Sequence, residues 1–204
     1  MLDAGAGEQQ YKKFCAHLEY VAQDFAEYDP KELPVGLQVP RFDYGKLDIV
    51  SDITAIPRED QSFDALLCAE VIEHIPNPVL AIQEFARLLK PRGKLILTAP
   101  FCSMTHFAPY HFCTGFSKFF YEHHLGANGF TILECTPNGN YFSYLAQELH
   151  RLATMANEYA SSSLSAITRL AIRSLIKTLQ SLSKRDTGSD ELLNFGYHIL
   201  AEKK

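Results

Sequence analysis

Acidic residues close three successive apolar segments in the first third of the chain, and this order constrains the fold more than any other feature. Asp24 ends the second apolar segment, Asp52 the third and Glu70 the fourth. Parallel strands present their carboxyl ends along one edge of a sheet, so the three carboxylates are expected along that edge. Short apolar runs alternating with helical patterns are typical of a parallel sheet with helices on both faces.

The first apolar segment is short and runs directly into a glycine turn. Only Met1 and Leu2 precede Asp3, and Gly5 and Gly7 follow it. Glycine takes positive φ without a steric penalty, which lets a ligand approach the backbone closely. We expect a short helix over residues 9–17 behind the turn, with its N-terminus facing the ligand.

The remaining elements follow from apolar periodicity and from turn residues. The expected fold class is α/β, with a Rossmann-like, mostly parallel sheet of seven strands, a truncated first strand and an antiparallel last strand. Asn77 is the expected N-cap of a helix that has Pro78 at its first position. The other strands are expected over residues 18–23, 47–51, 63–68, 94–99, 130–135 and 193–201, and a second helix over residues 116–125.

Two segments depart from this alternation. Residues 25–46 carry Pro30, Pro34 and Pro40, so an ordered loop is expected there in place of a helix. Residues 141–184 have a helical pattern and form an insertion before the last strand, which is interpreted as a lid, a dimer surface or both. The length of 204 residues indicates one domain, residues 1–204, that includes this insertion.

Composition excludes several functional classes. A net charge of −5 argues against a nucleic-acid partner. Five scattered cysteines fit neither a zinc pattern nor a disulfide framework, which indicates reduced thiols, a cytoplasmic protein and no metal site. No apolar run is long enough to cross a bilayer. Arg169, Arg173 and Lys177 form a basic stripe that is either an ordinary solvated face or a contact with an anionic membrane.

Two longer runs carry a family resemblance. Residues 64–74 read DALLCAEVIEH, and residues 88–95 read LLKPRGKL. With the glycine turn, these runs resemble the class I S-adenosylmethionine-dependent methyltransferases, in particular the type 11 group. The resemblance implies S-adenosylmethionine as cofactor and a small-molecule or saccharide acceptor.

The resemblance also implies where the cofactor binds. Asp3, Gly5 and Gly7 would hold its methionine part, and Asp24, followed by Phe25, its ribose. Asp52 and Ile53 would meet the adenine. The sulfonium side would be lined by Ala69, Glu70 and Val71.

The chemistry of two of these carboxylates is consistent with those roles but not unique to them. A ribose diol offers two donors to one carboxylate, which suits Asp24 at a strand end, although an aspartate there can also cap a turn. Asp52 can accept from the adenine amino group, and it can equally cap a helix.

The acceptor side is expected near the segment after the fifth strand. His106 and His111 are the candidates for a base that removes a proton from the acceptor, or for substrate contacts. The alternative is a loop held together by imidazole hydrogen bonds. His74, beside Glu73 and shortly before a proline, is interpreted as structural.

Methyl transfer to oxygen or nitrogen is the leading functional hypothesis. The alternatives are a methyltransferase-like binding protein with weak or no catalysis, and a nicotinamide-dependent oxidoreductase. Glu8 follows the turn, where a third glycine is common, and the first strand is short. From these two departures we expect weak cofactor binding and a truncated chain.

Overall fold

The computed structural model describes residues 1–33 and 35–204. Seven strands form one sheet in the order β3-β2-β1-β4-β5-β7-β6. The chain divides into two compact units, one comprising Met1–Thr136 with Gly196–Lys204 and the other Pro137–Phe195. The strands are β1 (Leu2–Ala4), β2 (Val21–Asp24), β3 (Ile49–Val50), β4 (Phe63–Ala69), β5 (Leu89–Pro100), β6 (Phe130–Asn138) and β7 (Gly196–Lys203). The α-helices are α1 (Pro78–Leu88), α2 (Lys118–Ala127), α3 (Tyr141–Ala160) and α4 (Ala166–Ser183), and the 3₁₀ turns are η1 (Lys12–Phe14), η2 (Ile72–His74) and η3 (Ser189–Glu191).

The sheet confirms the expected fold class. β1 pairs in parallel with both β2 and β4, and β4 pairs in parallel with β5. The last strand, β7, lies beside β6 and runs antiparallel to β5. At the outer end of the β5–β7 pair, Lys94 and Glu202 form an ion pair. The sheet therefore has the parallel core and antiparallel last strand that the sequence predicts. β5 and β6 are longer than expected, β3 is shorter, and β2 and β7 each begin three residues later.

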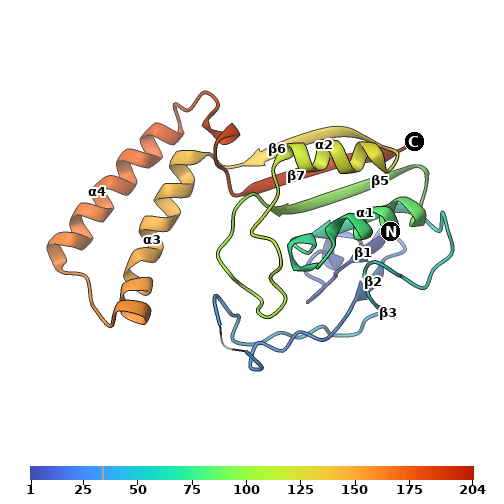
Figure 1. Cartoon of the computed structure of the whole chain (residues 1–204), viewed down its shortest axis with the longest axis horizontal. Helices are drawn as coiled ribbons and strands as arrows, with labels where there is room; N and C mark the ends of the chain where they lie inside the picture. Colours follow the sequence, from blue (N-terminus) through green and yellow to red (C-terminus); the bar gives the residue numbers. More distant parts are fainter. Residues whose placement is uncertain (34) are drawn as a thin grey trace. The chain divides into compact units, whose positions relative to one another are not determined.

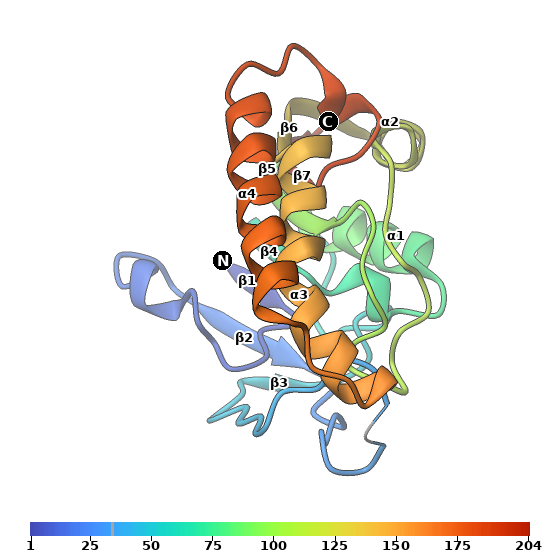
Figure 2. The same ribbon diagram turned by 90° about the vertical axis from the view of Figure 1, so that its left-hand side faces the viewer.

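Helix α1 contributes the largest buried helical face of the first unit. Its apolar residues recur at helical spacing, and Ile82, Phe85 and Leu88 are completely buried. Figures 1 and 2 place α1 and α2 on the same face of the sheet. Pro78 begins α1 and Asn77 occupies the N-cap position as expected, but the Asn77 side chain makes no capping hydrogen bond.

The helix predicted over residues 9–17 is wrong. Gln9 has a φ of +55°, which a right-handed helix cannot contain, and only the 3₁₀ turn η1 forms there. The Gln9 side chain instead donates to the backbone carbonyls of Tyr44 and Lys46, across the loop of residues 25–46. No α-helix lies between β1 and β4 in the described residues. This part of the chain therefore contributes none of the helices that were expected on the two faces of the sheet.

The connection from β3 to β4 contains no α-helix among its described residues. Side chains of α1 hold it in place. Buried Glu84 accepts a hydrogen bond from the backbone N–H of Ile56 at 2.8 Å. Arg87 pairs with Glu84 at 2.6 Å and with Asp60 at 2.7 Å. These bonds hold the segment that follows Asp52 against the core.

The second unit contains the helical insertion that the sequence predicts, as two helices. Figure 2 shows α3 and α4 lying side by side. Asn140 and Ser143 form a capping box at the start of α3, and Ser165 caps α4. The basic residues Arg169, Arg173 and Lys177 of α4 are exposed. In the described part of the chain, no helix has the length and apolar character needed to cross a membrane.

The loop expected over residues 25–46 is irregular wherever the structure describes it, and Pro34 lies outside the described residues. Its path is tied to the segment after β5, because the N–H of Leu37 donates to the carbonyl oxygen of Thr105 at 2.8 Å. The loop therefore runs beside the segment that carries His106.

Candidate functional site

A cavity of about 900 Å³ lies at the carboxyl ends of β1, β2 and β4 in the first unit. Its size is in the range of pockets that hold a small molecule or cofactor. Every residue that the sequence assigns to the cofactor lines it: Asp3, Gly5, Gly7, Asp24, Phe25, Asp52, Ile53, Ala69, Glu70 and Val71.

The glycine turn has the backbone geometry that the sequence predicts. Gly5 and Gly7 have φ values of +74° and +49°. The N–H groups of Gly5 and Ala6 both donate to the carbonyl oxygen of Gln23, which joins the turn to β2. A Cβ built on Gly5 would lie 2.5 Å from a methyl group of Val71. Both the backbone conformation and the available space therefore require glycine at position 5.

Gly5→Ala is expected to lower the free energy of unfolding by about 2 kcal/mol, because a left-handed conformation costs an L-residue about 1–2 kcal/mol and Val71 must also shift. Urea denaturation measures the change. Gly126→Ala is the matched control: it lies in α2 with no atom within 4 Å of the added Cβ. This control should raise stability by about 0.5–1 kcal/mol. Equal stability of the two variants would contradict the expectation.

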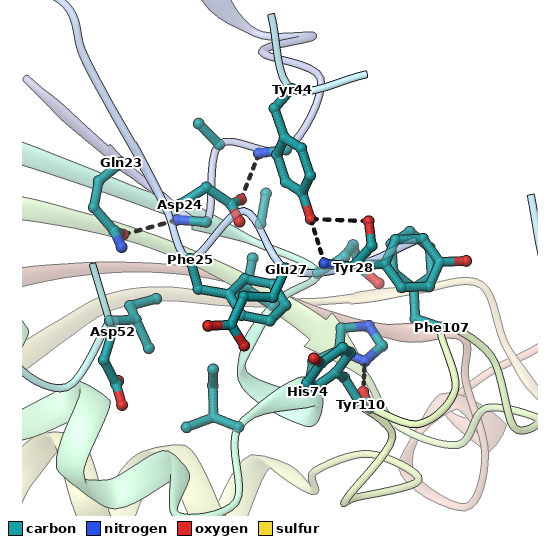
Figure 3. Close-up of a pocket in the computed structure, with 18 of the residues that line it drawn as sticks. Gln23, Asp24, Phe25, Glu27, Tyr28, Tyr44, Asp52, His74, Phe107 and Tyr110 are labelled. Carbon is teal, nitrogen blue, oxygen red and sulfur yellow. Dashed lines mark hydrogen bonds between the residues drawn. The ribbon is translucent and has the colours of Figure 1, made fainter. Parts of the chain in front are cut away.

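Asp24 is held at the centre of the site. It is 5% exposed, and its Oδ2 accepts from the N–H of Gly7 at 2.8 Å while its Oδ1 accepts from the N–H of Ala26 at 3.1 Å. Figure 3 shows its carboxylate directed toward the turn. Burial raises the pKa of Asp24, and the backbone donors partly offset this effect. A carboxylate has about four acceptor positions, so it can still accept from a diol.

Asp3 is a second buried carboxyl group in the same wall. It is 2% exposed, and the Tyr20 hydroxyl donates to its Oδ2. Burial raises its pKa to about 6, the Tyr20 hydrogen bond lowers it and the nearby charge of Asp24 raises it further. Two buried acidic groups thus lie together at the glycine turn.

Asp52 caps a turn and also lines the cavity. Its Oδ1 accepts from both the N–H and the hydroxyl of Thr54 at 2.8 Å, so it caps the turn that follows β3. It also lines the cavity, together with Ile53. Asp24 and Asp52 therefore share one hollow beside Gly5.

Three further aromatic residues of the loop over residues 25–46 form part of the wall, and the sequence did not assign them to the site: Tyr28, Phe42 and Tyr44. Tyr28 stacks on Phe107 with ring centroids 4.3 Å apart, and Phe42 meets Phe107 edge-on at 5.3 Å. The Tyr44 hydroxyl accepts from the N–H of Tyr28. Figure 3 shows the Tyr28, Tyr44 and Phe107 side chains on the same side of the cavity. The aromatic residues on either side of the proline-containing stretch were the available signal.

Two histidines were expected on the acceptor side. Of these, His106 lines the cavity and His111 does not. His74, which the sequence assigned only to a structural role, lines it as well. The N–H at Nδ1 of His74 donates to the carbonyl oxygen of Tyr110, so this histidine also has the structural bond that was expected. Figure 3 shows this bond.

Glu73 lies behind these histidines and is a residue that sequence reasoning missed. Its side chain is completely buried, and its Oε1 lies 3.5 Å from Nε2 of His74 and 3.8 Å from Nε2 of His106. Burial raises the pKa of Glu73 to about 8. Burial also lowers the pKa of His74 to about 4, so this imidazole is neutral at pH 7.

Comparison with known proteins identifies the family. Residues 2–97 match the family described as "Methyltransferase domain". These residues belong to that methyltransferase family, and they make up 96 of the 204 residues of the chain.

Curated relatives share part of the sequence of this chain. It is 37% identical over 105 residues to the ubiquinone biosynthesis O-methyltransferase of Xanthomonas axonopodis pv. citri (strain 306), covering 48% of the chain and 41% of the relative. It is 40% identical over 58 residues to the enzyme of the same name from Dechloromonas aromatica (strain RCB), covering 28% of the chain and 24% of the relative. The chain thus spans less than half the length of these relatives.

Solved structures agree with the methyltransferase fold. A putative sarcosine dimethylglycine methyltransferase from Galdieria sulphuraria superimposes with a TM-score of 0.54 at 16% identity, over 100% of this chain and 76% of that one. Phosphoethanolamine N-methyltransferase 2 of Haemonchus contortus, in complex with S-adenosyl-L-methionine, gives a TM-score of 0.55 at 19% identity over 100% and 48%. At these identities the likeness shows the fold alone.

Proposed function

We propose that this chain binds S-adenosylmethionine in the cavity beside Gly5 and takes part in methyl transfer to oxygen or nitrogen of a small molecule or saccharide. The observation that carries the proposal is the grouping of Gly5, Asp24 and Asp52 around one cavity in a methyltransferase domain. The cofactor supplies a methyl group bound to a positively charged sulfur. The activity of the relatives named above supports this reaction class.

The residues of the chain would hold the cofactor along the edge of the sheet. Asp24 would accept from the ribose hydroxyls, and Asp52 with Ile53 would contact the adenine. Asp3 and the glycine turn would hold the methionine part, with Ala69, Glu70 and Val71 near the sulfonium. In-line transfer depends on alignment, and good alignment contributes about 7–11 kcal/mol to lowering the barrier. The protein's main task is therefore positioning.

The acceptor would lie toward His74 and His106. A hydroxyl acceptor must lose a proton during transfer, and a neutral imidazole can take it. Nδ1 of His106 donates to the carbonyl oxygen of Met104 at 2.9 Å, which leaves its Nε2 as the proton acceptor. His111 was the other sequence candidate, and its absence from the cavity lining favours His106 for this role.

Calorimetric titration tests the proposal, followed by a transfer assay with labelled S-adenosylmethionine. The methyl donor and its demethylated product should both bind, and NAD should not, because Asp52 occupies the adenine side and Glu8 replaces a third glycine. Binding of NAD alone would favour the oxidoreductase alternative. Donor binding without transfer to a panel of phenols, amines and cell-envelope sugars would favour the binding-protein alternative.

The exposed face of α4 supports a separate proposal about partners. Ile167 and Leu170 are 83% and 69% exposed beside Arg169 and Arg173. Apolar and basic side chains together suit an anionic membrane surface, while the apolar residues alone suit a second copy of the chain. Both contacts remain proposals, together with a cytoplasmic location.

A further inference from the structure

Three histidines gather beside the cavity, and the proposed methyl transfer gives a role to only one of them. His74 comes from η2, and His106 and His111 come from the segment after β5. One ring nitrogen from each lies within 4.8 Å of the other two. The ring centroid of His106 lies 4.7 Å from the ring centroid of His74 and 4.8 Å from that of His111. His74, which lies more than thirty positions before the other two in the sequence, thus directs its imidazole to the same point as theirs.

The backbone fixes the orientation of two of these rings. Nδ1 of His74 faces the carbonyl oxygen of Tyr110, and Nδ1 of His106 faces that of Met104. A carbonyl oxygen only accepts, so each Nδ1 carries the proton and each Nε2 carries a lone pair. A histidine that binds a metal is usually held in this way, with its other ring nitrogen donating to a backbone carbonyl.

The third ring and a glutamate complete the cluster with groups that make no hydrogen bond among the described residues. Both ring nitrogens of His111 and both carboxyl oxygens of Glu73 are buried without a hydrogen bond among the described residues. The Glu73 side chain is fully buried, and its Oε1 lies 3.5 Å from Nε2 of His74 and 3.8 Å from Nε2 of His106. Buried polar groups are normally satisfied, so these atoms are available to a ligand.

We propose that His74, His106, His111 and Glu73 bind one divalent transition-metal ion, with zinc as the first choice. Three imidazole nitrogens and one carboxylate oxygen are a common zinc ligand set, and the ion would supply the positive charge that the buried carboxylate lacks. Zinc–nitrogen bonds of about 2.0–2.1 Å require the three rings to move closer together on binding. This site was not expected from the sequence, which showed no cysteine-based zinc pattern.

The proposed ion and the base role of His106 use the same lone pair. With the ion bound, Nε2 of His106 is a ligand and cannot accept a proton from the acceptor. The base role of His106 therefore applies only to the metal-free protein. Metal binding is measured separately from methyl transfer, so the failure of one can be told from the failure of the other.

Titration of chelator-treated protein with zinc chloride tests the inference by calorimetry. Wild-type protein should bind one equivalent, and His111→Ala and Glu73→Gln should each weaken binding at least 10-fold. The double variant His123→Ala/His124→Ala is the matched control, because it removes an adjacent histidine pair from α2 and should leave this binding unchanged. Absence of one-equivalent binding, or unchanged binding in His111→Ala, would overturn the site.

A second measurement covers the case in which a variant fails to fold. X-ray absorption of the zinc-loaded wild-type protein should show nitrogen and oxygen ligands at about 2.0–2.1 Å. Sulfur ligands at about 2.3 Å would place the ion on cysteines and would overturn the assignment.

Discussion

Asp24→Ala is expected to weaken S-adenosylmethionine binding by roughly 100-fold or more. Hydrogen bonds to a charged group contribute about 1.5–3 kcal/mol each, and a ribose diol would donate two of them to this carboxylate. Two such bonds amount to at least about 3 kcal/mol, and each 1.4 kcal/mol is a factor of ten in affinity. Calorimetric titration of the variant with the methyl donor measures the loss.

The controls separate ligand binding from stability. Asp24 also accepts from the N–H groups of Gly7 and Ala26, so its removal loosens the turn. Asp24→Asn keeps the side-chain volume and one acceptor oxygen, and should lose about 10-fold in affinity. Asp29→Ala removes an exposed carboxylate four positions beyond Phe25 that does not line the cavity, and should bind like wild type. Wild-type affinity in folded Asp24→Ala would contradict the ribose role.

The positions of the acidic groups were predictable from the sequence because strand order and strand direction determine them. Asp24 is the last residue of β2, Glu70 directly follows β4, and Asp52 lies two residues beyond β3. A parallel sheet places such residues at one edge whatever the loops do. This is why the whole predicted cofactor set lines a single cavity.

The sequence alone could not show that residues 9–17 do not form a helix. Tyr11, Phe14, Cys15 and Leu18 have helical spacing, yet Phe14 and Leu18 are 68% and 42% exposed. The path of this segment is set by long-range bonds, such as those from the Gln9 side chain to the loop around Tyr44. Local periodicity carries no information about such contacts.

The histidine cluster was also beyond the reach of sequence patterns. Glutamate is almost never fully buried, so nothing in the run around Glu73 indicated that its carboxyl group would be inside the protein. His106 and His111 were found from their position after a strand, but their meeting with His74 depends on how the segment after β5 folds back. Hydrogen bonds from the N–H groups of Phe112 and Cys113 to the carbonyl oxygen of Glu73 fix that fold.

The second large effect concerns Asp3, whose replacement by asparagine is expected to stabilise the protein at neutral pH. The folded state raises the pKa of this carboxyl group from 3.8 to about 6, chiefly by burial. Folding therefore favours the protonated form, and the charged form costs about 3 kcal/mol above pH 6, at about 1.4 kcal/mol for each pKa unit. Asparagine carries no charge and can still accept from the Tyr20 hydroxyl.

The sign of this effect sets its pH dependence. Below about pH 4, Asp3 is protonated in both the folded and unfolded states, so Asp3→Asn should have little effect. Between pH 4 and 6 the folded state binds more protons than the unfolded state, and the stability of the wild type falls as pH rises. Above pH 6 the full advantage of the variant, up to about 3 kcal/mol, should appear as a rise in Tm of about 6–12 °C.

Thermal unfolding of Asp3→Asn and wild type at pH 4.5, 6 and 7.5 tests this dependence, with the exposed Asp43→Asn as the matched control. A gain that is independent of pH would show that the burial of the charge is not its cause.

The same variant should bind S-adenosylmethionine more weakly, because an uncharged side chain attracts the cationic amino group of the methionine part less. If Asp3→Asn is more stable than the wild type and binds S-adenosylmethionine more weakly, the charge of Asp3 serves ligand binding and lowers the stability of the fold. Binding sites commonly show this trade-off between stability and function.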